Sequence, residues 1–232
     1  MKAALPSNEA QRLDALKEYH VLDTEAERIF DGITALAASI CGVPIALVSL
    51  VDESRQWFKS KVGLHQNQTP RDVAFCAHAI LQTEPLYVKD AMADSRFADS
   101  ALVTGEPHIR FYAGVPLVNP EGHVLGTLCA IDRKPRQLSA QQQEAMQILA
   151  RQVMSLLEFR RISARLADAL ARVRTLERLL LVCAWCGRIR GDEGHYCDLE
   201  TYLRTRTDTE FSHGICPECR AKHFPERKHV SP

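Results

Sequence analysis

The sequence lacks an excess of charge of either sign. Its 232 residues contain 29 Lys and Arg against 29 Asp and Glu, so the formal net charge is zero with neutral histidine. Binding to nucleic acid or to an anionic membrane draws on a surplus of positive charge. The composition therefore gives no electrostatic support to either partner, and we expect neither.

Long hydrophobic runs are also missing. The N-terminal segment, MKAALPSNEAQRLDALKEYH, shows no apolar core before a cleavage site, as a signal peptide would. The longest apolar stretch, VPIALVSLV over residues 43–51, is far shorter than the ~20 residues that cross a bilayer. We therefore expect a cytoplasmic protein without a membrane span.

The motifs of several signalling enzymes are absent as well. The sequence contains no phosphoacceptor histidine box, no ATP-binding glycine boxes of a kinase and no cyclase signature. If the protein signals, its output must therefore pass through a partner protein.

Cysteine, by contrast, is plentiful and unevenly placed. Eight cysteines in a chain expected to be cytoplasmic favour metal binding, redox sensing or core packing over structural disulfides. Cys41, Cys76 and Cys129 are scattered through the first two thirds of the chain. The remaining five lie in the last quarter: Cys183, Cys186, Cys197, Cys216 and Cys219. The distribution of cysteines therefore divides the sequence into a long first part with few thiols and a short C-terminal part that is rich in them.

The order of expected elements in the first part predicts an α+β domain. Helical spacing of apolar residues indicates helices over 7–19, with Ser7 as the N-cap, and over 24–41. The run PIALVSLVD and the following QWFKSKVG read as a strand hairpin, and FCAHAILQ and PLYVKD as a short helix and a short strand. Two further strands, IRFYAGVPLVN and HVLGTLCAIDR, are joined by the turn NPEG. A helix then begins at Ser139, with Gln142 placed to complete a capping box.

These segments together carry a resemblance. The run VPIALVSLVDESRQWFKSKVGL, then FCAHAIL, then DSRFADSALVTGEPHIRFYAGVPLVNPEGHVLGTLCAIDRKPR and the exit helix resemble a GAF domain over about residues 8–160. The resemblance implies an antiparallel sheet with flanking helices, a ligand pocket over one face and a regulatory role for residues 8–158. Similar domains bind cyclic nucleotides, haem, bilins or small metabolites, so the ligand stays unidentified.

The polar residues expected to line this pocket are few. They are Cys76, His78, Arg110, Tyr112 and Asp132. Arg110 suits an anionic ligand group, or it pairs with Asp94 or Asp99 of the preceding loop. Either His78 or His108 is able to serve as a haem ligand, although such histidines more often pack in a core or lie at the surface. Cys76 and Cys129 form a thiol switch if they approach each other, and otherwise are two small buried hydrophobes, the interpretation we favour here.

The helix that leaves this domain is expected to form a homodimer. Apolar residues alternate in steps of three and four for roughly three heptads, typical of a two-stranded coiled coil over residues 159–181. The positions of this seam are Phe159, Ile162, Leu166, Ala169, Val173, Leu176 and Leu180. The alternative is a terminal helix that folds back on its own domain.

The cysteines at the end of the chain indicate a metal site in residues 182–226. The pair Cys183 and Cys186 is matched, after 29 intervening residues, by Cys216 and Cys219. Two such pairs in so short a segment favour a structural zinc ion held tetrahedrally by the four thiolates. Gly187 directly follows the first pair, where the turn often needs a positive φ.

Other interpretations of the same residues remain open. An iron–sulfur cluster also accepts such cysteines. His213 or Cys197 can replace one ligand. The segment CAWCGRIRGDEGHYCDLETYLRTRTDTEFSHGICPEC also resembles a small cysteine-rich tail that follows a coiled coil in bacterial sensor proteins and response regulators. That likeness implies a signalling context and no particular activity.

The sequence as a whole predicts a non-catalytic signal-transduction sensor. In this interpretation, the GAF domain binds a small ligand or senses redox state. It then passes the signal through a dimeric helix to a zinc module. The alternatives are a thiol-based redox enzyme or sensor, and a nucleic-acid-binding zinc module regulated by the GAF domain.

Metal analysis of the purified protein tests the prediction of a four-cysteine zinc site. We expect zinc in an amount equal to the protein, no visible absorption, and tail thiols that react with a thiol reagent only after chelation. Visible absorption from iron or haem would contradict the zinc assignment or reveal a pigment in the GAF domain.

Overall fold

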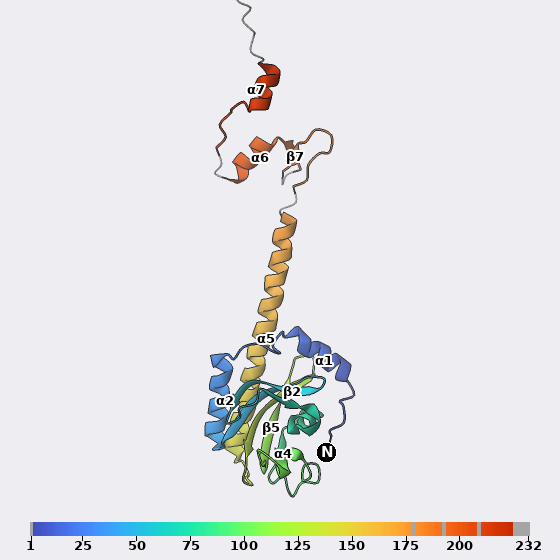
Figure 1. The fold of residues 1–232 in the computed structure, drawn as a ribbon, viewed down its shortest axis with the longest axis vertical. Helices are drawn as coiled ribbons and strands as arrows, with labels where there is room; N and C mark the ends of the chain where they lie inside the picture. The colour runs from blue at the N-terminus through green and yellow to red at the C-terminus, as the bar shows by residue number, and fades with distance from the viewer. Residues whose placement is uncertain (1, 178–179, 192–193, 208–209, 225–232) are drawn as a thin grey trace, which may run out of the picture. The chain divides into compact units, whose positions relative to one another are not determined.

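The computed structural model describes residues 2–177, 180–191, 194–207 and 210–224. The chain divides into two compact units, with the boundary between Ala167 and Asp168 (Figure 1). None of the helices in the described ranges is both long enough and apolar enough to cross a bilayer.

The first unit is built on a six-stranded antiparallel sheet of order β3-β2-β1-β6-β5-β4. The strands are β1 (Ile45–Val51), β2 (Arg55–Val62), β3 (Gln68–Pro70), β4 (Leu86–Val88), β5 (Phe111–Val118) and β6 (Val124–Asp132). The expected β1–β2 hairpin and the β5–β6 pair are confirmed. The antiparallel α+β fold that the sequence predicts is therefore correct.

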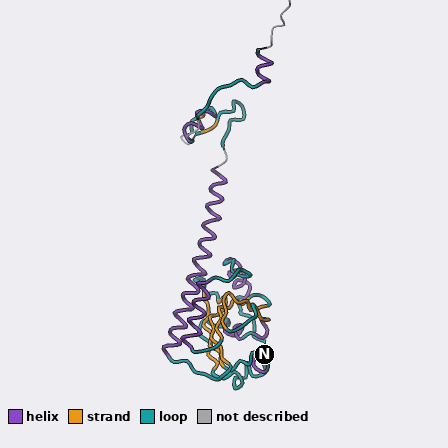
Figure 2. Tube along the Cα trace, turned by 60° about the vertical axis from the view of Figure 1, so that its left-hand side comes forward, coloured by secondary structure: helices purple, strands orange, loops and turns teal. Residues whose placement is uncertain are grey.

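Both faces of this sheet are covered. Helices α2 (Arg28–Cys41) and α5 (Ala140–Glu177) pack on one face, where Val48, Val115 and Leu128 belong to a single core cluster (Figure 2). The short helices α3 (Phe75–Ala79) and α4 (Ala101–Thr104), with the η1 turn (Arg71–Val73), belong to the other side. Side chains alternate along each strand, so successive residues enter different cores.

The first two helices begin later than the sequence indicates. Helix α1 spans Glu9–Glu18 and has Asn8, not Ser7, at its N-cap position, without a side-chain capping bond. The expected Ser7 cap is wrong. Helix α2 begins at Arg28 rather than Thr24, because the Thr24 hydroxyl donates to the carbonyl of Val21 in a turn. Its end at Cys41 is as expected.

Helix α5 begins as the sequence predicts. The Ser139 hydroxyl accepts a hydrogen bond from the backbone N–H of Gln142 at 3.2 Å, and the Gln142 side chain accepts one from the N–H of Ser139 at 2.9 Å. This reciprocal pair is a capping box. The first half of the helix is buried in the core through Met146, Val153 and Leu157.

The seam residues that follow are exposed wherever their side chains are described. Phe159 is 71% exposed, and Ile162 and Leu166 are each 59% exposed. The helix therefore does not bury this part of the seam against its own domain. The coiled coil itself stays a prediction, and its residues 178–179 lie outside the described chain.

The second unit contains short elements after α5. They are the hairpin strands β7 (Ile189–Arg190) and β8 (Tyr196–Cys197), and the helices α6 (Leu199–Arg206) and α7 (Pro217–His223). Asp198 caps α6 by accepting a hydrogen bond from the N–H of Thr201 at 2.8 Å.

Two buried guanidinium groups flank the Glu9 carboxylate, one from α1 itself and one from the η1 turn. Arg12 and Arg71 are 1% and 5% exposed, and both ion-pair with the carboxylate of Glu9, at 2.8 and 2.5 Å. Partial burial raises the pKa of Glu9, but the hydrogen bonds and charges of the two arginines outweigh burial and lower the pKa to about 2. A buried cation without its partner is costly.

The stability that Glu9 contributes should therefore decrease as the pH is lowered. Its folded pKa lies below the ordinary 4.5, so the contribution is complete above pH 4.5 and decreases as pH falls toward 2. We expect Glu9→Gln to unfold more easily than wild type at pH 7 and the difference to shrink across that window. Urea unfolding at several pH values measures it.

The control for this experiment is Asp14→Asn on the same helix. Asp14 pairs with Lys17 where both side chains are at least 70% exposed, so we expect a smaller change. Equal pH dependence in both variants would contradict the role given to Glu9.

Candidate functional site

A cavity of about 400 Å³ opens on the sheet face opposite α2 and α5. Its walls are mainly apolar, with Leu47 and Ile131 from the sheet and Phe75 from α3. Polar groups, among them Gln56 and Arg133, complete the lining. Cavities of this size and character are typical of small-molecule sites.

Cys76 lines this cavity at the centre of a buried polar cluster. Its Sγ atom accepts hydrogen bonds from the hydroxyls of Thr127 at 3.0 Å, Ser49 at 3.2 Å and Tyr112 at 3.3 Å. The thiol of Cys129 belongs to the same buried cluster and contributes to the electrostatics of Cys76. All of these side chains are buried. Four potential donors therefore converge on one sulfur atom.

The sheet register explains why these groups meet. Ser49 on β1 and Thr127 on β6 are direct cross-strand partners, and Cys129 is two residues further along β6 on the same face. Tyr112 comes from β5, and its ring lies over Gly114. A Cβ atom at Gly114 would stand 2.2 Å from the Tyr112 hydroxyl oxygen, so glycine there leaves room for the ring.

The cluster changes the acidity of its members. Burial raises the pKa of the Cys76 thiol, but the hydrogen bonds from Cys129, Ser49, Thr127 and Tyr112 outweigh burial and hold it below its ordinary value. The hydrogen bond to Cys76 and then burial raise the pKa of Cys129. Cys76 is therefore the sulfur that carries the negative charge more readily.

The structure places the five expected pocket residues differently. Cys76 and Tyr112 line the cavity, whereas His78, Arg110 and Asp132 are outside its lining. His78 lies edge-on to Phe97 instead, with ring centroids 4.8 Å apart.

The two charged members of that set form ion pairs. Arg110 pairs with Asp90 at 2.7 Å, rather than with the expected Asp94 or Asp99. Asp132 is buried and accepts a hydrogen bond from Arg136. These pairs connect loops and strand ends, so the charges are already balanced within the domain.

Sequence reasoning missed Ser49 and Thr127. Both interrupt strands that are otherwise apolar, IALVSLV and VLGTLCAID, and both are 0% exposed. A polar residue on a fully buried strand face needs a partner. That pattern is the signal by which they could have been found.

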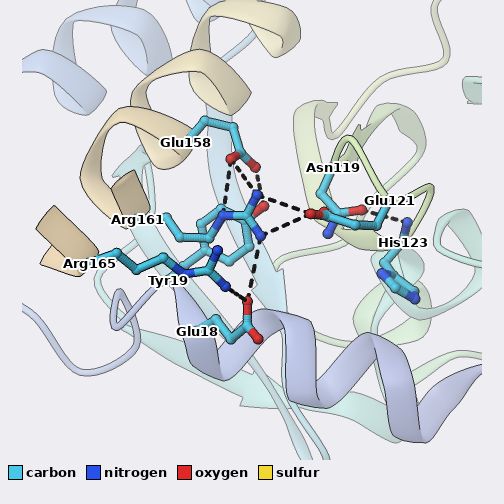
Figure 3. A network of polar contacts seen from close by, with 8 residues as sticks. All are labelled: Glu18, Tyr19, Asn119, Glu121, His123, Glu158, Arg161 and Arg165. Carbon is cyan, nitrogen blue, oxygen red and sulfur yellow. Dashed lines mark hydrogen bonds and ion pairs between the residues drawn. The ribbon is translucent and has the colours of Figure 1, made fainter. Parts of the chain in front are cut away.

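A second polar cluster joins α5 to the rest of the domain (Figure 3). The Arg161 guanidinium, 9% exposed, pairs with Glu158 at 2.9 Å, Glu121 at 3.1 Å and Glu18 at 3.5 Å. It also lies over the Tyr19 ring, 5.2 Å from the centroid, while the Tyr19 hydroxyl donates to Glu158. Arg161 thus connects α5 with α1 and with the β5–β6 turn.

The cysteine pairs of the second unit have a local geometry suited to thiolates. The backbone N–H groups of Cys186 and Trp185 hydrogen-bond to Cys183 and lower its pKa. Gly187 has φ +71°, as the sequence predicts for the turn. At the second pair, the N–H of Cys219 donates to the Sγ of Cys216 at 3.4 Å. A structural zinc site of four cysteines would need two such pairs.

The described chain does not gather these ligands into one cluster. Within it, no group of three or more His, Cys, Asp or Glu side chains is placed to hold a metal ion. Cys197 faces the carbonyl of Ile189 at 3.8 Å, and His213 pairs with Glu200 at 3.3 Å. Zinc on Cys183, Cys186, Cys216 and Cys219 remains a prediction.

An antiparallel sheet with a helical core on one face and a small-molecule cavity on the other is the arrangement expected of a ligand-binding α+β domain. The GAF domain profile matches residues 25–157. The chain therefore belongs to the GAF domain family. The match does not reach the cysteine-rich tail.

A relative of known name matches the chain over 151 residues. It is the cyclic di-GMP phosphodiesterase of Pseudomonas aeruginosa, 46% identical over 65% of this chain and 26% of the relative. The chain thus spans about a quarter of the length of the curated relative that it matches.

Solved structures of the same fold agree. One is the GAF domain of a phosphoenolpyruvate-protein phosphotransferase from Coxiella burnetii, with 14% identity and a TM-score of 0.51. The aligned region covers 68% of the present chain and 99% of the Coxiella domain. The blue-light absorbing PixJ GAF domain of Thermosynechococcus elongatus covers 73% and 98%, at 16% identity and TM-score 0.50. At this identity, the likeness establishes the fold alone.

Replacing Arg161 tests how strongly the second cluster stabilises the domain. Arg161→Met keeps the length of the side chain and removes the charge, which leaves Glu158 and Tyr19 with one partner fewer. We expect a loss of about 1–3 kcal/mol in the free energy of unfolding. Denaturant unfolding measures it.

The matched control is Arg165→Met, one turn further along α5. Arg165 pairs with Glu18 at 2.7 Å but is 61% exposed, so we expect a change within about 0.5 kcal/mol. If both variants lost the same stability, burial of Arg161 would not be the cause.

Proposed function

We propose that this chain is a non-catalytic sensor whose GAF domain binds a small molecule in the cavity beside Cys76 and Tyr112. Occupancy of the cavity shifts the β5–β6 hairpin, and helix α5 of a homodimer passes this shift to a zinc-bound tail. The tail then acts on a partner protein. The observation that carries the proposal is that one hairpin contributes to both the cavity and the Arg161 cluster.

The lining of the cavity limits the ligand. Its apolar walls favour a compact, largely apolar molecule, with polar groups directed toward Gln56 or Arg133. Arg110 is neutralised by Asp90, which makes it a weaker anchor for an anion than the sequence indicates.

The β5–β6 hairpin supplies the mechanical connection. Tyr112, near the start of β5, lines the cavity, and Glu121, in the turn after β5, pairs with Arg161 of α5. A ligand that moves Tyr112 therefore changes the position of a carboxylate that holds α5. Such a two-site connection is the physical basis for signalling through a helix.

The exposed seam supports the dimer. Phe159 and Ile162 also line a groove of about 800 Å³ between α5 and the region of β5. A second copy of α5 packed along the seam would cover these residues and remove them from water. The dimer then offers alternative packings between which a small shift can choose.

The name of the Pseudomonas relative does not make this chain a phosphodiesterase. The match covers 26% of that protein, so we propose that the two share an input domain rather than a reaction. A nucleic-acid role for the tail gains no support from the balanced charge of the chain.

Thermal unfolding of the full chain with a panel of small ligands tests the binding site. The panel contains aromatic and aliphatic carboxylic acids, cyclic nucleotides and cyclic di-GMP. A compound that binds the folded state stabilises it and so raises the melting temperature. At a ligand concentration one hundred times Kd, the stabilisation is about 2.7 kcal/mol. We expect Ile131→Trp, which fills the cavity, to abolish the shift, and Ile29→Trp on the exposed side of α2 to retain it.

Hydrogen exchange of residues 156–167 then tests the transmission. We expect the active compound to change exchange there in wild type and not in Arg161→Met, although that variant still binds. A shift retained by Ile131→Trp would place the ligand elsewhere, and unchanged exchange in wild type would contradict the role of α5.

A further inference from the structure

We propose that Cys76 is a peroxide-reactive cysteine and that Cys129 resolves its oxidised form as an intramolecular disulfide. This deepens the proposed function, on which it rests, by assigning a redox input to the sensing cavity. The substrate class is a small hydroperoxide able to enter a cavity of about 400 Å³. The sequence alone favoured two inert buried residues, whereas the structure places the two thiols in one buried cluster.

The arrangement of the two sulfurs suits this division of roles. Cys76 is 1% exposed and Cys129 is 0% exposed, but only Cys76 lines the cavity. A molecule in the cavity therefore meets Cys76 first. Thr127, whose hydroxyl is 3.0 Å from the Cys76 sulfur, is two residues from Cys129 on the same face of β6, and both cysteines belong to one buried cluster. This placement makes Cys129 the candidate to attack Cys76 once Cys76 is oxidised.

The hydroxyl groups around Cys76 favour its thiolate form, which is the nucleophile. Thr127 and Tyr112 donate to Sγ from two neighbouring strands, and Ser49 donates from a third. Three hydroxyls on one sulfur exceed what an inert packing residue requires. Their direction toward the sulfur is the geometric basis of the proposal.

The reaction balances as two displacements. The Cys76 thiolate attacks the terminal oxygen of a hydroperoxide, so an S–O bond forms and the O–O bond breaks. The leaving alkoxide takes a proton from water and departs as an alcohol, or as water when the oxidant is hydrogen peroxide. The sulfur has lost two electrons and the peroxide has gained them.

The second displacement forms the disulfide. The Cys129 sulfur attacks the Cys76 sulfenic acid, the S–O bond breaks, and the hydroxyl leaves with the Cys129 proton as water. A dithiol such as dithiothreitol reverses the state by thiol–disulfide exchange. The input is thus reversible.

Cys41 provides an internal control. It is also buried, at 2% exposed, but burial without such donors raises its pKa to about 11. A general loosening of the domain would expose Cys41 together with Cys76. A reaction specific to the cluster leaves Cys41 reduced.

Peptide mapping of the full-length protein tests the proposal without any substitution. The zinc-replete protein is treated with hydrogen peroxide, blocked with an alkylating reagent in denaturant, and cut with trypsin. Residues 72–89 and 111–133 form separate peptides containing Cys76 and Cys129, and Cys41 lies in 29–55. We expect the first two to appear joined, two hydrogens lighter than their sum, and the third to stay alkylated.

Cysteine variants separate the two steps. We expect Cys129→Ser to accumulate Cys76 sulfenic acid, trapped by dimedone, and Cys76→Ser to leave Cys129 reduced. Reduction with dithiothreitol should restore both peptides in wild type. Cys76 that stays reduced, or that is oxidised no faster than Cys41, would overturn the proposal.

Removal of one donor tests the role of the hydroxyls. Thr127→Val keeps the shape of the side chain, so we expect the midpoint of the pH profile of Cys76 to rise by about one unit. Cys76 should then react about tenfold more slowly at pH values well below that midpoint. Thr34→Val is the control, because this buried hydroxyl bonds to the carbonyl of Phe30 far from the cluster. An unchanged pH profile in Thr127→Val would contradict activation by Thr127.

These outcomes differ from those of the ligand experiment. If the disulfide forms but exchange of residues 156–167 does not change, the cysteine chemistry stands and the proposed transmission fails. If a ligand alters exchange but Cys76 stays reduced, the sensor stands and the redox input is wrong.

Discussion

The alternation of side chains along β1, β5 and β6 is the constraint on which the rest of the structure depends. Because neither face of these strands meets water, each strand contributes to two cores at once. One core fixes α2 and α5 to the sheet, and the other contains the cavity and its sulfur cluster. The residues that line the cavity are therefore close neighbours, along the same strands, of residues that pack against α5.

The polar groups of the domain are arranged by the same constraint. Ser49 and Thr127 occupy positions where an apolar residue would pack, and their hydroxyls are satisfied by each other and by Cys76. The buried cationic groups have carboxylate partners instead, as Arg71 has in Glu9. The cavity thus combines apolar walls with one reactive atom, a combination suited to a sensor of small, weakly polar molecules.

The sequence predicted the fold well where a local pattern decides the structure. The apolar runs of β1 and β6, the NPEG turn, the capping box at Ser139 and the positive φ of Gly187 all depend on neighbours in the chain. The sequence-based prediction failed where several partners compete for one side chain. The Thr24 hydroxyl bonds to the Val21 carbonyl, so α2 begins later than expected. Arg110 pairs with Asp90 because the folded loop brings these two residues together. The approach of Cys76 to Cys129 depends on how α3 packs on the sheet, which no periodicity encodes.

Arg161 faces carboxylates from three separate segments, and this number matters for how α5 can move. A guanidinium has several N–H groups pointing in different directions, so it can release one acceptor while it retains the others. The helix is then able to turn or slide by exchanging partners, without the cost of leaving the charge unpaired at any stage. Rotation of α5 and retention of its anchor are therefore compatible.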